Sequence, residues 1–215
     1  MSNWLDPENK LMSAINRVID ALVIGTLWFI CCIPIFTVGA SSTAYYYAYN
    51  KSIRQRRGYA YKEFFSAFKS NFKQSTKMWL IVIALYLITA LDVYILINQP
   101  EPTAYSQIIL MVILVIICGL TAWALFMFPY LARFTNRTRV MLKNSLLITI
   151  GNLFWAIVLL ILAAAMAFVF VILPFAMFVA PAIYMWFANR IMERIFRKYM
   201  SEEDRKKQDE LEKMA

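Results

Sequence analysis

Residues 108–132 read IILMVILVIICGLTAWALFMFPYLA and contain no charged side chain. A helix needs roughly 20 apolar residues to cross the hydrocarbon core of a bilayer, which is about 30 Å thick. This stretch of 25 residues is long enough to do so. Because a helix pairs all of its own backbone groups within one segment, such a stretch predicts a membrane-spanning helix.

Further apolar runs lie on both sides of this one. Met78–Ile97 contains one charge, Asp92, and Leu146–Leu173 contains none. The apolar run that begins at Pro174 is expected to form a separate helix. Residues 146–188 are far too long for one crossing, and Pro174 is a helix breaker. We predict an all-α, polytopic membrane helix bundle that forms a single domain over residues 1–200. Its helices are expected near 18–33, 36–54, 78–98, 108–132, 146–172 and 174–189.

The stretch 36–54 decides whether the chain crosses six times or five. Pro34 and Gly39 separate it from the first apolar run, and its tyrosines and hydroxyl residues make it only mildly apolar. Since unpaired backbone cannot face lipid, the stretch must be helical or packed among helices. We predict that it crosses. The alternative is a five-helix protein.

The composition excludes several classes of protein. The chain has 215 residues, of which 61% are apolar and 16% charged, and its mean hydropathy is +0.59. Soluble domains are about 45–50% apolar and about 25% charged, so an ordinary soluble enzyme is excluded. The absence of histidine excludes catalytic triads and His-ligated metal sites. Three cysteines lie in apolar runs without metal-binding spacing, so we expect no metal and no cofactor.

The basic residues predict the orientation in the membrane. The segment 41–77 carries eight Lys and Arg against one acid, and 133–144 carries four and no acid. The loop 98–107 and the turn at 173–175 carry none. Because Lys and Arg are enriched on the cytoplasmic side, 51–77, 133–144 and a charged helical tail at 201–215 are predicted to be cytoplasmic. With six crossings the N-terminus is cytoplasmic too, and with five it is outside.

Residues 59–75 predict an amphipathic helix at the cytoplasmic membrane interface. Its aromatic residues fall on one helical stripe and its lysines lie off that stripe. One interpretation is a face for anionic headgroups or a partner protein, and the other is a connecting helix packed under the bundle. Topology already explains the charge, so we do not expect nucleic-acid binding. The candidate face comprises Lys62, Phe64, Phe65, Phe68, Lys69, Phe72 and Lys73.

Two places inside the predicted bundle are candidate binding sites. Asp92 is the one charge in the middle part of a span, where a carboxylate costs about 2.5–3.5 kcal/mol. It either faces the bundle interior or lies in water near the outer interface. The polar turn between the first two helices must be buried in protein or line a cavity, and its other interpretation is a packing motif at a helix break. The candidate residues are Pro34, Thr37, Gly39, Ser41, Thr43 and Asp92.

Two motifs resemble the YesL-like family of bacterial membrane proteins. Residues 27–44, LWFICCIPIFTVGASSTA, resemble its pattern of an LW-rich span followed by P-x-x-T-x-G-A-S/A-x-x-A. Residues 64–74, FFSAFKSNFKQ, resemble its F-F-x-x-F-K/R-x-N-F-K/R-Q block. The resemblance implies a multi-pass protein of the bacterial cell membrane. The family has no established function, and members are often encoded beside carbohydrate ABC transporters and two-component sensors.

The sequence shows neither paired carboxylates nor an activated serine or cysteine, so we do not expect an enzyme. We expect a membrane accessory or regulatory protein linked to carbohydrate uptake or sensing. Its partner would be a carbohydrate ABC transporter or a sensor kinase, which it would contact through the 51–77 face and the tail. The alternative is a small secondary transporter or channel that uses Asp92 and the turn at 34–43.

Overall fold

The computed structural model describes residues 10–99, 104–200, 202–203, 205–206 and 210. All regular structure within these residues is helical, as predicted. Two short elements, η1 and η3, are 3₁₀ helices, and η2 is a π-helix. In chain order the elements are α1 (Lys10–Cys32), η1 (Ile35–Thr37), α2 (Val38–Ala48), η2 (Tyr49–Arg54), α3 (Ala60–Ile97), α4 (Ala104–Arg133), α5 (Thr138–Gly151), α6 (Leu153–Ile172), η3 (Pro174–Phe178) and α7 (Ala180–Phe196).

Within the described residues, four helices are long and apolar enough to cross a membrane: α1, α3, α4 and α6. The predicted count of six is therefore not confirmed. α2 has 11 residues and α7 has 17, which at 1.5 Å per residue gives about 17 Å and about 26 Å. Both are shorter than a hydrocarbon core of about 30 Å. The predicted tail at 201–215 lies largely outside the described residues.

α3 corrects the prediction of two separate helices at 59–75 and 78–98. It runs unbroken for 38 residues. Its sequence changes from charged to apolar after Lys77, and this change was the basis for predicting a boundary there. However, a helix is broken by glycine or proline, and α3 contains neither. The turn before it uses Gly58, whose φ of +72° suits glycine.

A break that was not predicted divides the apolar run at 146–172. α5 ends at Gly151 and α6 begins at Leu153. Between them Asn152 leaves the helical conformation, with φ −127° and ψ 42°. Its side-chain Nδ2 donates to the Ile148 carbonyl at 2.9 Å, which satisfies one acceptor at the end of α5. Hydropathy alone does not reveal such a break, because both sides of it are apolar.

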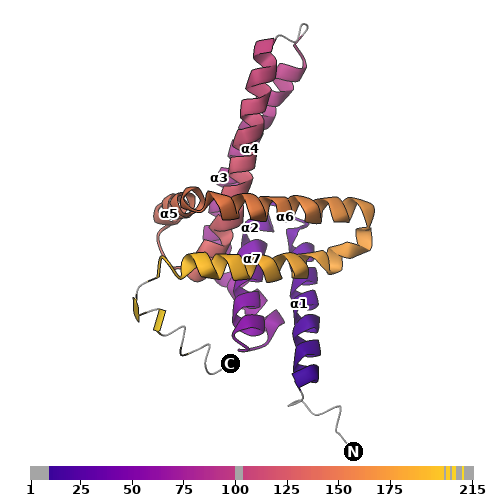
Figure 1. Cartoon of the computed structure of the whole chain (residues 1–215), viewed down its shortest axis with the longest axis vertical. Helices are drawn as coiled ribbons and strands as arrows, with labels where there is room; N and C mark the ends of the chain where they lie inside the picture. Colours follow the sequence, from indigo (N-terminus) through magenta and orange to yellow (C-terminus); the bar gives the residue numbers. More distant parts are fainter. Residues whose placement is uncertain (1–9, 100–103, 201, 204, 207–209, 211–215) are drawn as a thin grey trace, which may run out of the picture.

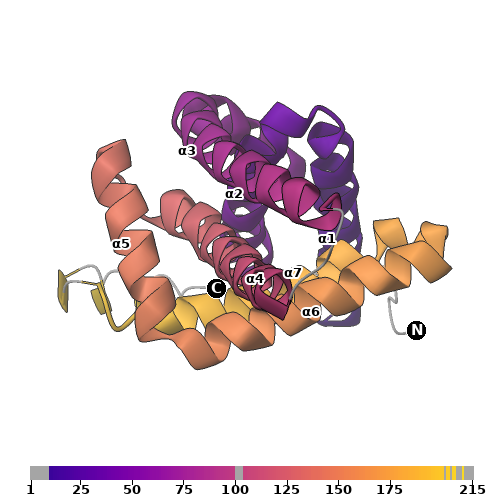
Figure 2. The ribbon, with the colours of Figure 1, turned by 90° about the horizontal axis from the view of Figure 1, so that it is seen from above.

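The helices of the structure do not all run in one direction (Figure 1). α3 and α4 form a long hairpin that rises out of the body of the molecule, and α1 and α2 lie beside its lower part (Figure 1). α6 and α7 run side by side across the body, crosswise to α1 (Figures 1 and 2). A topology with six crossings would therefore require α6 and α7 to turn relative to α1 and the α3–α4 hairpin.

The core lies where α2, the first half of α3, the second half of α4 and the second half of α7 meet. Tyr46, Phe64, Phe126 and Phe196 are each at most 1% exposed there. By contrast, large apolar side chains are exposed on the upper part of the α3–α4 hairpin and at positions along the whole length of α6. Such surfaces are typical of helices that face lipid. The buried part of the body is therefore the place to look for a site.

Candidate functional site

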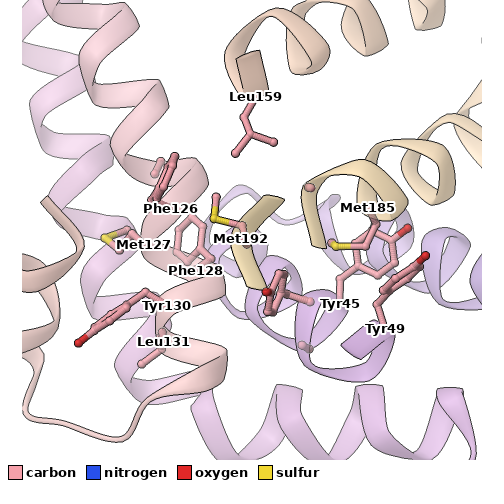
Figure 3. Packing of buried hydrophobic residues seen from close by; sticks show 14 of the residues in the cluster. Tyr45, Tyr49, Phe126, Met127, Phe128, Tyr130, Leu131, Leu159, Met185 and Met192 are labelled. Atoms are coloured by element: carbon pink, nitrogen blue, oxygen red, sulfur yellow. The ribbon is translucent and has the colours of Figure 1, made fainter. Parts of the chain in front are cut away.

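A cavity of about 250 Å³ lies in the body, where α1, α2, α3, α4, α6 and α7 meet. Aromatic rings dominate its wall. Trp28 stacks on Tyr45 with ring centroids 5.8 Å apart, and Trp79 meets Phe128 edge to face at 5.9 Å. Figure 3 shows Tyr45, Phe128 and Met185 of this wall among the neighbouring core residues. Tyr46, Tyr86 and Tyr184 complete the aromatic lining.

The polar groups in this wall are mostly bonded to one another. Trp28 Nε1 donates to Ser42 Oγ at 3.2 Å, and the hydroxyls of Tyr86 and Thr121 lie 2.8 Å apart. The buried Tyr45 hydroxyl has no hydrogen-bond partner in the described structure. A sugar would bring many hydroxyls that each need a partner, and burying them unpaired is costly. The cavity therefore suits an apolar ligand with one or two polar groups.

A buried cluster of charges lies next to the cavity. Glu193 of α7 is 1% exposed, and Tyr46 of α2 donates its hydroxyl to Glu193 Oε1 at 2.8 Å. The other carboxylate oxygen, Oε2, lies 3.2 Å from Arg54 Nη1 of η2 and 3.6 Å from Arg133 Nη2 of α4. The contiguous elements α2 and η2 are thus joined at one carboxylate to α4 and α7, which are far from them in the sequence.

This cluster constrains the fold strongly. The two arginine side chains are 28% and 19% exposed, whereas the carboxylate is 1% exposed. Leaving one member of a buried ion pair uncompensated costs about 3–5 kcal/mol. A change in the position of any one of the four elements would incur part of that cost. The π-helical form of η2, which carries Arg54, is itself uncommon and is often found at functional sites.

A polar pocket of about 200 Å³ shares Tyr46 with the cavity. Asn50, Gln55, Arg57 and Arg133 are among its lining residues. Lys51, which also lines it, forms an ion pair with Glu63 at 2.8 Å, and this hydrogen bond raises the pKa of Lys51. Tyr46 lines both the cavity and this pocket, so it separates an apolar space from a polar one.

The hydroxyls of the predicted turn site bond to backbone carbonyls. Thr37 Oγ1 lies 2.6 Å from the carbonyls of both Cys31 and Pro34. Ser41 donates to a carbonyl of α1 at 3.0 Å, and Thr43 donates within α2 at 2.9 Å. The geometry is that of a packing motif at a helix break, with Pro34 exposed at the surface.

Gly39 permits a close approach between helices. A Cβ atom at this position would lie 2.7 Å from Trp79 Cβ, 2.8 Å from the Ser75 carbonyl oxygen and 2.9 Å from Phe128 Cε1. α2, α3 and α4 therefore pack closely at this glycine. Two of these neighbours, Trp79 and Phe128, also line the aromatic cavity.

Asp92 lies away from both spaces. Its side chain is exposed on the outer part of α3, and it lines neither the cavity nor the polar pocket. The structure therefore does not bring Asp92 together with the turn at 34–43. The two features proposed for a transport site do not form one site.

The predicted face at 59–75 is divided between the core and the surface. Phe64 is fully buried, and Phe68 stacks on it with ring centroids 6.3 Å apart. Phe72 is partly buried and continues this row. Phe65 remains exposed, as do the three lysines Lys62, Lys69 and Lys73. Phe64, Phe68 and Phe72 pack on the protein's own body, and the lysines face outward.

The charge cluster was not predicted. Glu193 lies on α7, beyond the predicted helix at 174–189 and before the predicted tail at 201–215. A signal was present: it is the one acid among four basic residues in the segment 190–198. Met192, Ile195 and Phe196, at offsets of one to three residues, are buried with it. An acid on the apolar face of a basic helix indicates a buried partner.

Residues 22–93 match the model of a family described as a protein of unknown function, DUF624. The match covers about one third of the chain and includes most of the stretch that carries the two motifs described above. It assigns no activity. No curated protein and no solved structure matches the chain.

Proposed function

We propose that this chain is a non-catalytic accessory or regulatory protein of the bacterial cell membrane, linked to carbohydrate uptake or sensing. The observation that carries the proposal is the position of Tyr46. Its ring lines the aromatic cavity, and its hydroxyl bonds to the buried carboxylate that joins α2, η2, α4 and α7. An apolar ligand in the cavity would bias the packing of the helices around it. That change would reach the charged segments at 51–57 and 133–137.

The proposal includes the YesL-like assignment and a six-crossing topology. Residues 36–50 would form the second crossing, shielded by their neighbours, and both termini would be cytoplasmic. The partner would be a carbohydrate ABC transporter or a sensor kinase. Three exposed lysines, Lys62, Lys69 and Lys73, offer a cytoplasmic face for it or for anionic headgroups.

The geometry supports this function better than the transporter or channel alternative. A transport site needs polar groups that face a passage. Here Asp92 is exposed and is not part of the cavity lining, and the turn hydroxyls are engaged with backbone. The mostly apolar wall favours a bound effector over a sugar in transit.

Filling the cavity tests the proposal. Ala163 lines the cavity, whereas its neighbour Ala164 is exposed. The Ala163→Phe variant should abolish the effect of this protein on sugar uptake or sugar-dependent signalling, because a ring would occupy the ligand space. The matched variant Ala164→Phe should behave as wild type. Uptake and response are measured in a deletion strain that is complemented with each variant.

The partner is identified in the same strains. Purification in mild detergent should recover importer or kinase subunits with the wild-type chain, and recovery should fall for Ala163→Phe. The proposal fails if the deletion changes neither uptake nor signalling. It also fails if Ala163→Phe and Ala164→Phe behave alike.

A further inference from the structure

A groove of about 750 Å³ between α1, η2 and α7 belongs to neither of the spaces described above. It is larger than the aromatic cavity, and it lies within the usual range of ligand sites, about 300–1,000 Å³. Its wall has an apolar part and a basic part. The apolar part comprises Val18, Leu22, Val179, Ala182, Ile183 and Phe187.

Three arginines from three elements line the basic part: Arg17, Arg54 and Arg190. Arg17 Nε donates to the Ser13 carbonyl at 3.0 Å, and the Arg190 guanidinium lies 3.8 Å from the ring centroid of Trp186. These contacts hold the side chains in place. An arginine has five N–H donors, so Arg17 and Arg190 keep donors for a ligand. Arg54 adds a third positive charge, shared with Glu193.

Asn189 provides an independent indication of a ligand. It lines the groove and is 1% exposed, and its Nδ2 is buried without a hydrogen-bond partner in the described structure. Leaving a buried donor unsatisfied costs about 1–3 kcal/mol. An acceptor atom of a ligand would remove that cost. All the polar groups named here donate, so the ligand must present acceptors and negative charge.

We infer that this groove binds an anionic phospholipid of the surrounding bilayer. The phosphate would lie among Arg17, Arg190 and Asn189, and one acyl chain would lie along the apolar part. A soluble phosphate would leave that part unoccupied. Val18 and Ile183 are 59% and 55% exposed, and α1 is long and apolar enough to cross the membrane, so the groove is open to lipid. Bidentate arginines are well suited to phosphate.

Native mass spectrometry of the full chain in detergent tests the assignment. Phosphatidylglycerol and phosphatidylcholine of equal chain length are titrated, and retained lipid is counted. Wild type should retain phosphatidylglycerol preferentially. Each cation near an anionic headgroup is worth about a fivefold gain in affinity, so Arg17→Gln with Arg190→Gln should lose about 25-fold. Arg139→Gln with Lys143→Gln removes the same charge at two exposed positions outside the groove and should keep wild-type affinity.

Two further variants separate the headgroup from the chain. Asn189→Leu removes the donor at unchanged charge and should weaken phosphatidylglycerol binding several-fold. Val18 is exposed, and Val18→Trp should block the apolar part of the groove and abolish lipid retention. This variant tests the site independently if the arginine double variant does not fold. Millimolar inorganic phosphate should not displace the lipid.

Three results would overturn the inference. The first is equal retention of the two lipids by wild type. The second is an equal loss of phosphatidylglycerol affinity in the double variant of Arg17 and Arg190 and in the control double variant. The third is displacement by inorganic phosphate, which would identify a site for a free anion.

Discussion

At the scale of single residues, the packing of the helices depends on contacts that leave no room for one added carbon atom. Gly39 is the clearest case, because three atoms from α3 and α4 lie within 3.0 Å of the position that a Cβ would take. Gly119 on α4 is the opposite case, with nothing within 4 Å of such an atom. The two glycines therefore form a matched pair.

Gly39→Ala should destabilise the protein and Gly119→Ala should not. Alanine is a better helix former than glycine by about 0.5–1 kcal/mol, so both variants share that gain. At position 39 the added methyl overpacks α2 against α3 and α4, which costs about 1–3 kcal/mol. Thermal unfolding in detergent, followed by circular dichroism, measures the difference. A Gly39→Ala variant as stable as Gly119→Ala would show that the three helices are less closely packed.

The residues that form the candidate site differ in how well the sequence predicts them. The aromatic stripe at 59–75 was recognisable because helical period is a local property, whereas the neighbours of Gly39 come from distant helices. The bond between Tyr46 and Glu193 joins residues 147 positions apart, and local patterns contain no such information. The arginines that meet this carboxylate follow the positive-inside rule as well, so topology already accounted for their charge.

At the scale of elements, the apolar stretches located the helices but not their ends. The core of every predicted span lies within a helix, because hydropathy reports the environment of a segment. Helix ends depend on individual residues. α3 continues through Lys77 because no glycine or proline interrupts it, and the run at 146–172 breaks at Gly151 and Asn152. The six-crossing count depended on the stretch 36–54, in which α2 ends at Ala48 and η2 follows.

The continuity of α3 can be measured as a distance. Lys69 and Leu87 are both exposed, and an 18-residue separation is five helical turns, or about 27 Å along a straight helix. Spin labels at these positions, with Cys31, Cys32 and Cys118 replaced by alanine, should give a narrow distribution near that value in pulsed electron resonance. A joint near Lys77 would give a shorter, broad distribution and would restore the predicted two-helix arrangement.

At the scale of the whole molecule, the crosswise course of α6 and α7 raises a question that charge patterning did not anticipate. An interfacial helix needs a polar face. α6 has none, because its sequence is apolar from Leu153 to Ile172. Phe154, Phe168 and Val171 are 70%, 66% and 81% exposed, so this helix requires hydrocarbon around it. The segments on either side of the α6–α7 hairpin are basic, and the turn between its helices is not.

The apolar sequence of α6 and the basic segments that flank the α6–α7 hairpin predict that the turn at η3 is reached from outside the cell. Phe175 in this turn is 85% exposed, so a cysteine there would be accessible. In a background without Cys31, Cys32 and Cys118, Phe175→Cys should react with a membrane-impermeant thiol reagent in intact cells. Asn98→Cys should react as well, and Asn136→Cys should react only after lysis. If Phe175→Cys resists labelling while Asn98→Cys reacts, α6 and α7 lie within the membrane plane and the predicted outward turn is wrong.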